Sequence, residues 1–248
     1  MPSILFLDIE TFPNIAYVWG KYDQNVIRYI QEGCIATFAC KWLDRKGVIA
    51  QSLPDYEGYK PVSYDDKKLV QDLWYLLDAA DIVIAHNGDD FDIRVCNAAF
   101  IRHGMKPPSP FKTVDTKKAV KRVARFNSNA LDDLSSTLGM GKKLKTDFDL
   151  WEGCIAGDKK SWKQMVEYNV HDVLLLEKLY LKIRPWVRTH PNFTVETGGL
   201  CPKCNSSNVQ YRGYAITSTR KYRRFQCKDC GGWGRLTKSE GSSGVTNG

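Results

Sequence analysis

The sequence lacks a long apolar run, a targeting signal and internal repeats. No hydrophobic stretch reaches the roughly 18 residues that span a bilayer, so we expect no transmembrane helix and no membrane partner. Met1-Pro2-Ser3 leads directly into apolar residues, which leaves no room for the basic and apolar regions of a secretory signal peptide. We therefore expect a cytoplasmic protein whose thiols remain reduced.

Most of the chain has little net positive charge. The formal net charge is +8, and residues 195–248 contribute +6 of it, with nine Lys or Arg and three acidic residues. The first 194 residues contain 27 basic and 25 acidic residues. This asymmetry predicts a C-terminal module that binds a polyanion.

The order of the expected elements indicates an α/β fold. Antiparallel strands come first, then a helix, a buried strand and further helices, which suits a mixed sheet with helices on both faces. The polar segment 140–158 is expected to be an exposed connection. The expected strands are the opening apolar segment and residues 15–19, 35–42, 48–53 and 82–85. One expected helix begins at residue 65 or 66, and the others cover residues 93–103, 130–138 and 160–183.

Two carboxylates interrupt the opening apolar strand. Asp8 and Glu10 lie two residues apart, so the alternation of side chains places them on the same face. Like charges on a buried strand repel each other and resist burial, and Mg²⁺ or Mn²⁺ would relieve both effects. The alternative is a helix-capping signal, in which Asp8 and Glu10 open a helix.

A second acidic segment follows the buried strand 82–85. Asp89, Asp90 and Asp92 lie near the C-terminal end of that strand, where open α/β sheets place their sites. Helix capping explains Asp89 and Asp90, whereas Asp92 can reach inward from the helix.

A third polar pair lies on the long helix 160–183. Tyr168 and Asp172 are spaced i, i+4 and share one helical face, which Leu175 and Leu179 continue toward the core. The alternative is a hydrogen-bonded tyrosine and a buried ion pair. We expect His171, which lies about 100° around the helix from Asp172, to be at the surface or to support the site.

These three segments together resemble the motifs of the DEDD superfamily of 3′→5′ exonucleases. They read Asp8-x-Glu10, Asn87-x-x-x-Phe91-Asp92 and Tyr168-x-x-x-Asp172. The tyrosine is similar to that of the tyrosine subclass, which includes proofreading domains of family B polymerases; the histidine subclass would have His where Glu167 stands. The resemblance covers roughly residues 3–185 and extends to stand-alone, YprB-like nucleases. It implies a ribonuclease H-like mixed sheet flanked by helices.

The resemblance also implies a two-metal site. Asp8, Glu10, Asp92 and Asp172 would hold two Mg²⁺ or Mn²⁺ ions about 4 Å apart, which activate water and stabilise the leaving 3′ oxygen. Tyr168 would orient the attacking water, because a phenol with a pKa of about 10 is a poor base at neutral pH.

Two further residues, one beside the first motif and one within the second, are expected to contact nucleic acid. Phe12 would stack on a terminal base, and Asn87 would hydrogen-bond the substrate. The alternatives are core packing for Phe12 and helix capping for Asn87. Asp115 is expected to be structural or to support the site.

Four of the eight cysteines form two Cys-x₂-Cys pairs, Cys201/Cys204 and Cys227/Cys230, with 22 residues between them. This spacing predicts one structural Zn²⁺ held by four thiolates and resembles a zinc ribbon. Two disulfides are the alternative. The expected organisation is an exonuclease domain over 1–190, a linker over 191–199, the zinc ribbon over 200–236 and a disordered tail over 237–248.

Basic and aromatic residues interleave between the two cysteine pairs, as expected for a surface that binds phosphates and stacks on bases. A solvated hairpin whose aromatic rings pack beside the zinc is the alternative, and both can hold. The residues expected to contact nucleic acid here are Arg212, Tyr214, Arg220, Lys221, Tyr222, Arg223 and Arg224.

The sequence therefore predicts a metal-dependent 3′→5′ exonuclease that acts on single-stranded nucleic acid or on the 3′ ends of duplexes. DNA is the expected substrate, although no residue distinguishes it from RNA. Family analogy suggests replication or repair proteins as partners, in a bacterial or phage-infected cell. The alternatives are a structure-specific endonuclease on the same fold and a non-catalytic adaptor that binds nucleic acid through its zinc ribbon.

Overall fold

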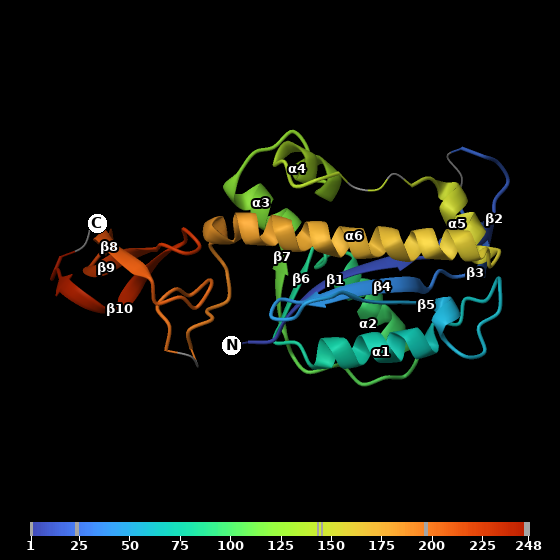
Figure 1. Cartoon of the computed structure of the whole chain (residues 1–248), viewed down its shortest axis with the longest axis horizontal. Coiled ribbons are helices and arrows are strands. Elements are labelled where there is room, and N and C mark those ends of the chain that lie inside the picture. Colours follow the sequence, from blue (N-terminus) through green and yellow to red (C-terminus); the bar gives the residue numbers. More distant parts are fainter. Residues whose placement is uncertain (1, 23–24, 143, 145, 196–197, 246–248) are drawn as a thin grey trace. The chain divides into compact units, whose positions relative to one another are not determined.

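The computed structural model describes residues 2–22, 25–142, 144, 146–195 and 198–245 (Figure 1). The chain divides into two compact units, of which the first is Ser3–Leu179 and the second begins at Tyr180. Within the described ranges, no helix combines the length and the apolar character that crossing a membrane requires.

The first unit is built on a five-stranded mixed sheet in the order β5-β4-β1-β6-β7. The central strand β1 (Ile4–Thr11) pairs antiparallel with β4 (Ile35–Trp42) and parallel with β6 (Ile82–Ala85). Strand β5 (Ile49–Ser52) extends the antiparallel side, and β7 (Lys112–Asp115) extends the parallel side. Because the sheet is covered on both faces, β4 and β6 are almost entirely buried.

Helices lie on both faces of this sheet (Figure 1). Helices α1 (Lys67–Asp78) and α2 (Asp92–Arg102) cover one face, and the long helix α6 (Lys159–Ile183) crosses the other. This arrangement confirms the predicted fold class. The shorter helices are α3 (Thr116–Val123), α4 (Leu131–Thr137), α5 (Phe148–Ile155) and the 3₁₀ segments η1 (Leu53–Asp55) and η2 (Arg184–Trp186).

The prediction of an exposed connection over 140–158 is wrong for residues 148–155. Helix α5 occupies Phe148–Ile155, and its Leu150 and Cys154 are buried. An eight-residue helix shows only two turns of apolar periodicity, so its pattern is too short to stand out from a polar connection.

A separate two-stranded sheet follows β1. It pairs β2 (Ile15–Tyr17) with β3 (Arg28–Gln31), and every residue of β3 is exposed. The expected strand 15–19 therefore ends earlier, and Trp19 is 89% exposed.

The second unit contains a three-stranded antiparallel sheet in the order β10-β9-β8. Its strands are β8 (Val209–Ile216), β9 (Arg220–Cys227) and β10 (Trp233–Ser242). The predicted disordered tail over 237–248 is wrong in its first part, because Ser239, Gly241 and Ser242 pair with β9. Strand pairing uses the backbone, so a Ser- and Gly-containing segment can join a sheet without apolar side chains. Residues 246–248 of that tail lie outside the described residues.

Candidate active site and cysteine cluster

Asp8 and Glu10 occupy the part of β1 that extends beyond its parallel neighbour. Strand β6 pairs with β1 only from Ile4 to Phe6, whereas pairing with β4 continues through Glu10 and Thr11. Both carboxylate-bearing residues are half-buried. The alternative of a helix-capping signal is wrong, because this segment is a strand.

Helix α6 brings a third carboxylate to the same place. Ligand oxygens of Asp8, Glu10 and Asp172 lie within 4.8 Å of one another, and Asp172 is only 2% exposed. Carboxylate oxygens are the donors that hard divalent cations prefer. This carboxylate group could therefore hold Mg²⁺ or Mn²⁺, which would also offset the mutual repulsion of the three charges.

Asp92 lies beside β1 but outside this carboxylate group. It is buried at the start of α2, and its Oδ1 accepts a hydrogen bond from the backbone N–H of Ile9 at 3.2 Å. Ile9 lies beyond the end of the β6 pairing, so the carboxylate takes the place of a strand partner. Burial raises the pKa of Asp92 to about 7. Its role as a metal ligand stays a prediction.

Asn169 is a residue of the site that the sequence analysis missed. Its Nδ2 donates to Asp8 Oδ2 at 2.6 Å and to the backbone carbonyl of Asp8 at 3.2 Å. The hydroxyl of Thr37 in turn donates to Asn169 Oδ1 at 3.3 Å. Asn169 is fully buried, so it fixes the orientation of the Asp8 carboxylate from α6. A polar residue next to Tyr168 on the helix face that meets the sheet was the available signal.

Tyr168 lies one helical turn before Asp172 and is 6% exposed. Its ring contacts that of Trp151 edge to face, with the ring centroids 6.3 Å apart. Trp151 Nε1 donates to the backbone carbonyl of Thr11 at 3.1 Å, which links α5 to the end of β1. The helix face that carries Tyr168 and Asp172 therefore packs toward β1, as its spacing predicts.

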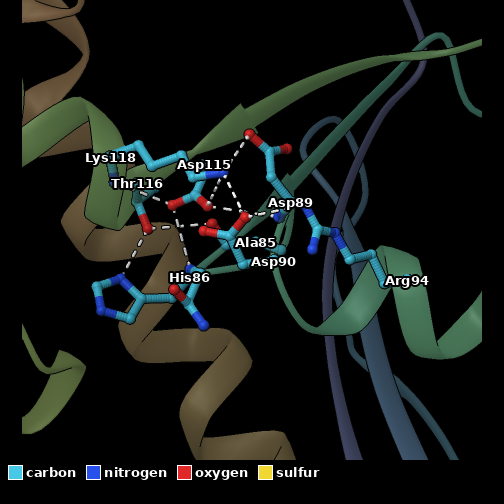
Figure 2. Close-up of polar contacts among 9 residues, drawn as sticks. Ala85, His86, Asp89, Asp90, Arg94, Asp115, Thr116 and Lys118 are labelled. Carbon is cyan, nitrogen blue, oxygen red and sulfur yellow. Dashed lines mark hydrogen bonds and ion pairs between the residues drawn. The ribbon is translucent and has the colours of Figure 1, made fainter.

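Asp115 organises the loop between β6 and α2 (Figure 2). Its carboxylate accepts from the backbone N–H groups of Asn87 at 3.2 Å and Asp89 at 3.4 Å, and it caps α3 through Lys118 N at 3.0 Å. His86 also fixes this loop, because its Nδ1 lies 2.9 Å from Thr116 Oγ1. Asp115 thus has the supporting role that was expected.

The explanation of Asp89 and Asp90 as helix caps is wrong. The N-cap of α2 is Phe91, and no side-chain hydrogen bond caps this helix. Both carboxylates instead contact Lys118 Nζ, at 3.4 Å for Asp89 and 2.9 Å for Asp90 (Figure 2). The sequence could not reveal this ion cluster, because Lys118 reaches the loop from α3.

The predicted stacking of Phe12 on a nucleic acid base is wrong. Phe12 is 3% exposed, and its ring packs against those of Tyr64 and Trp162 at centroid distances of 5.2 and 5.6 Å. No face of the ring is left for a base. Asn87 adopts a left-handed backbone conformation with φ of 70°, which suits the turn that it forms. Its contact with nucleic acid stays a prediction.

The four cysteines of the second unit converge. Their Sγ atoms all lie within 4.8 Å of one another, with 3.6 Å between Cys201 and Cys230 and 3.7 Å between Cys204 and Cys227. Disulfide sulfurs lie about 2.05 Å apart, so these pairs are not disulfides. Sulfurs about 2.3 Å from a tetrahedral zinc would lie about 3.8 Å apart, which matches the cluster. The four thiols could therefore hold such an ion.

Comparison with known proteins places the chain in a superfamily. Residues 30–184 match the RNase_H superfamily, and the chain belongs to it. This match confirms the predicted ribonuclease H-like fold. It includes Asp92, Tyr168 and Asp172 but begins after Asp8 and Glu10. The DEDD and YprB-like assignments stay predictions.

A solved structure shows the same fold. The family B DNA polymerase from the hyperthermophilic archaeon Pyrobaculum calidifontis is similar, with a TM-score of 0.54 and 17% sequence identity over 75% of this chain. The chain covers 25% of that polymerase, about a quarter of its length. No curated protein sequence matches the chain significantly.

Proposed function

We propose that this protein is a metal-dependent 3′→5′ exonuclease that releases nucleotides from the ends of single-stranded nucleic acid. One observation carries the proposal: oxygens of Asp8, Glu10 and Asp172 converge within 4.8 Å on a chain of the RNase H superfamily. The fold alone supports a nuclease, and the motif resemblance adds the exonuclease specificity.

Asp8, Glu10 and Asp172 would hold the divalent ions, and Asp92 would complete the ligand set from the start of α2, where its carboxylate accepts from the backbone N–H of Ile9. Two Mg²⁺ or Mn²⁺ ions would supply the positive charge that activates water and neutralises charge on the reacting phosphate. The donors are all carboxylates, which suits these ions.

The side chains around the ions would orient the reacting groups. In the hydrolysis, the water oxygen bonds to phosphorus, the bond from phosphorus to the 3′ oxygen breaks, and that oxygen takes up a proton. The released nucleotide keeps the phosphate on its 5′ oxygen. Tyr168 would orient the water through its hydroxyl, and Asn169 would hold Asp8 in its ligating orientation.

The four cysteines would hold one Zn²⁺ with a structural role, because four protein ligands leave no position for a substrate. Cys201 and Cys227 are buried, and Cys204 and Cys230 are half-buried. A unit this small has little core of its own, so zinc binding would contribute to its folding.

Linear and circular single strands would test the proposal. With Mg²⁺ or Mn²⁺, 5′-labelled linear DNA or RNA should yield a ladder of products that shorten from the 3′ end, and a circular strand should remain intact. Comparing DNA and RNA identifies the substrate. The double variant Asp8→Ala, Glu10→Ala should be inactive, and its zinc content should equal that of the wild type.

Three outcomes would contradict the proposal. Cleavage of the circle would favour the endonuclease alternative. Activity that survives in the double variant would show that catalysis does not depend on the carboxylate group. Complete inactivity of the wild type on both nucleic acids would favour the non-catalytic adaptor.

A further inference from the structure

The register of the second unit's sheet divides its basic and aromatic residues between two faces. Tyr211 pairs with Phe225, but the next aligned pair is Tyr214 with Arg223, so one extra residue interrupts β8. Gly213 at this bulge has a φ of 62°, which glycine adopts readily. Because of the bulge, Arg212 and Tyr214 lie on opposite faces, although simple alternation would place them together.

One face merges with the core of the unit. Phe225 and Cys227 of this face are 2% and 1% exposed. The guanidinium carbon of Arg223 lies 5.3 Å from the ring centroid of Tyr214, and Arg223 Nη1 donates to the Tyr214 hydroxyl at 3.0 Å. Lys221 Nζ lies 4.3 Å from the same ring. On this face, Arg223 is therefore bound to Tyr214 of the neighbouring strand, and Lys221 lies over the same ring.

The other face presents guanidinium groups beside aromatic rings. The guanidinium carbons of Arg212 and Arg224 lie 5.7 and 4.9 Å from the ring of Trp233, which is 41% exposed. The guanidinium carbon of Arg235 lies 3.9 Å from the ring of Tyr222. The arginine–aromatic face consists of Arg212, Arg220, Tyr222, Arg224, Trp233 and Arg235.

The aligned residues of this face carry positive charge and no negative charge. No Asp or Glu is among the aligned residues of the three strands, and Glu240 of β10 lies at a register shift between Ser239 and Gly241. All four arginines of the face are exposed. Arg220 and Arg224 are four residues apart on β9, which is about 13 Å at roughly 3.3 Å per residue. A ligand along this face must therefore carry repeated negative charge.

We infer that the arginine–aromatic face binds single-stranded nucleic acid, with the guanidinium groups on phosphates and with Trp233 and Tyr222 on bases. Planar guanidinium groups match phosphate oxygens, and every base has a face that an aromatic ring can stack on. Bases in a duplex already stack on each other, so a single strand fits better. This inference rests on the proposed nuclease function for the identity of the ligand. It adds Trp233 and Arg235 to the expected contacts and removes Tyr214, Lys221 and Arg223, which lie on the opposite face.

Two pairs of substitutions in the full-length, zinc-loaded protein would test the inference. The first pair, Arg212→Gln with Arg224→Gln, removes two charges from the arginine–aromatic face. The matched pair, Lys221→Gln with Arg223→Gln, removes two charges from the opposite face of the same sheet. Binding of fluorescein-labelled oligo(dT) and oligo(rU) is measured by anisotropy at several salt concentrations, in an Asp172→Asn background that prevents cleavage.

The first pair should weaken binding about tenfold or more and reduce the slope of log affinity against log salt by about 1.4, because each phosphate contact contributes about 0.7 for single strands. The matched pair should change the affinity less than about threefold. Trp233→Ala should weaken binding about tenfold without changing the slope, because stacking releases no counterions. Zinc content equal to that of the wild type excludes misfolding as the cause.

Equal losses from both pairs would overturn the inference, because binding would then follow net charge alone. No loss from the first pair, or tighter binding of a blunt duplex than of the single strand, would overturn it as well. The assay does not depend on cleavage. If the wild type binds as described but never cleaves, the proposed function fails and the binding face stands.

Discussion

Replacing Asp172 by Asn should have opposite effects on stability with and without divalent metal. Asp172 lies within 4.8 Å of oxygens of both Asp8 and Glu10. One pair of full charges at that separation costs about 3.5 kcal/mol at an effective dielectric constant of about 20. Because Asp8 and Glu10 are half-buried, solvent screening reduces this cost. We expect the substitution to stabilise the metal-free protein by about 1–2 kcal/mol.

The measurement is thermal unfolding of the first unit, before and after addition of Mn²⁺, with zinc retained throughout. For a chain of this size, about 1–2 kcal/mol raises the Tm by roughly 2–8 °C. Mn²⁺ should stabilise the wild type by about 2.7 kcal/mol at a concentration 100 times its Kd. The variant should lose most of this gain, because one ligand is missing, and it should not cleave nucleic acid.

Glu177→Gln provides a matched control on the same helix. Glu177 Oε1 lies 2.5 Å from Lys41 Nζ, so this carboxylate has a cationic partner and its removal should destabilise the protein. Its response to Mn²⁺ should equal that of the wild type. The reasoning is refuted if Asp172→Asn lowers the Tm of the metal-free protein, or if it retains the full Mn²⁺ response.

Three further predictions follow from the same geometry. Asn169→Ala removes the donor 2.6 Å from Asp8 and should raise the Mn²⁺ concentration for half-maximal activity about 10- to 100-fold, and an unchanged midpoint would contradict its positioning role. Since burial raises the pKa of Asp92 from 3.8 to about 7, the folded metal-free protein holds a proton that the unfolded chain has lost. Its stability in urea should therefore fall as the pH rises from about 4 to about 7, and Asp92→Asn should flatten this dependence, whereas an identical slope in the variant would count against the shift. Cys204→Ser should leave 3–179 resistant to trypsin but expose the second unit to cleavage, and unchanged resistance there would argue against a structural metal.

Local patterns in the sequence determined most elements and the two sets of candidate ligands. The apolar run 82–85 is a buried strand with the expected bounds, and the long helix begins one residue before its expected start. Asp8 and Glu10 share a strand face because side chains alternate, and Tyr168 and Asp172 share a helix face because they are one turn apart. The spacing of the two cysteine pairs likewise predicted that four thiols meet, as they do in the structure. The shared strand face and the shared helix face depend on neighbours in the chain, and the cysteine pairs follow a recognisable spacing, so the sequence alone contains these signals.

Only the tertiary structure decided which distant groups meet. Asn169 contacts Asp8 across 161 positions, and Lys118 of α3 reaches Asp89 and Asp90 in the loop before α2. Phe12 is adjacent to the first motif, yet packing against distant rings buries it.

The C-terminal sheet shows the same limit. One extra residue at Gly213 shifts the register of β8 and moves Tyr214 to the face opposite Arg212. Periodicity within one strand cannot reveal such a shift, because the register depends on the partner strand. The sequence therefore determined that the module is basic and aromatic, and only the folded sheet decided which arginines and rings share a surface.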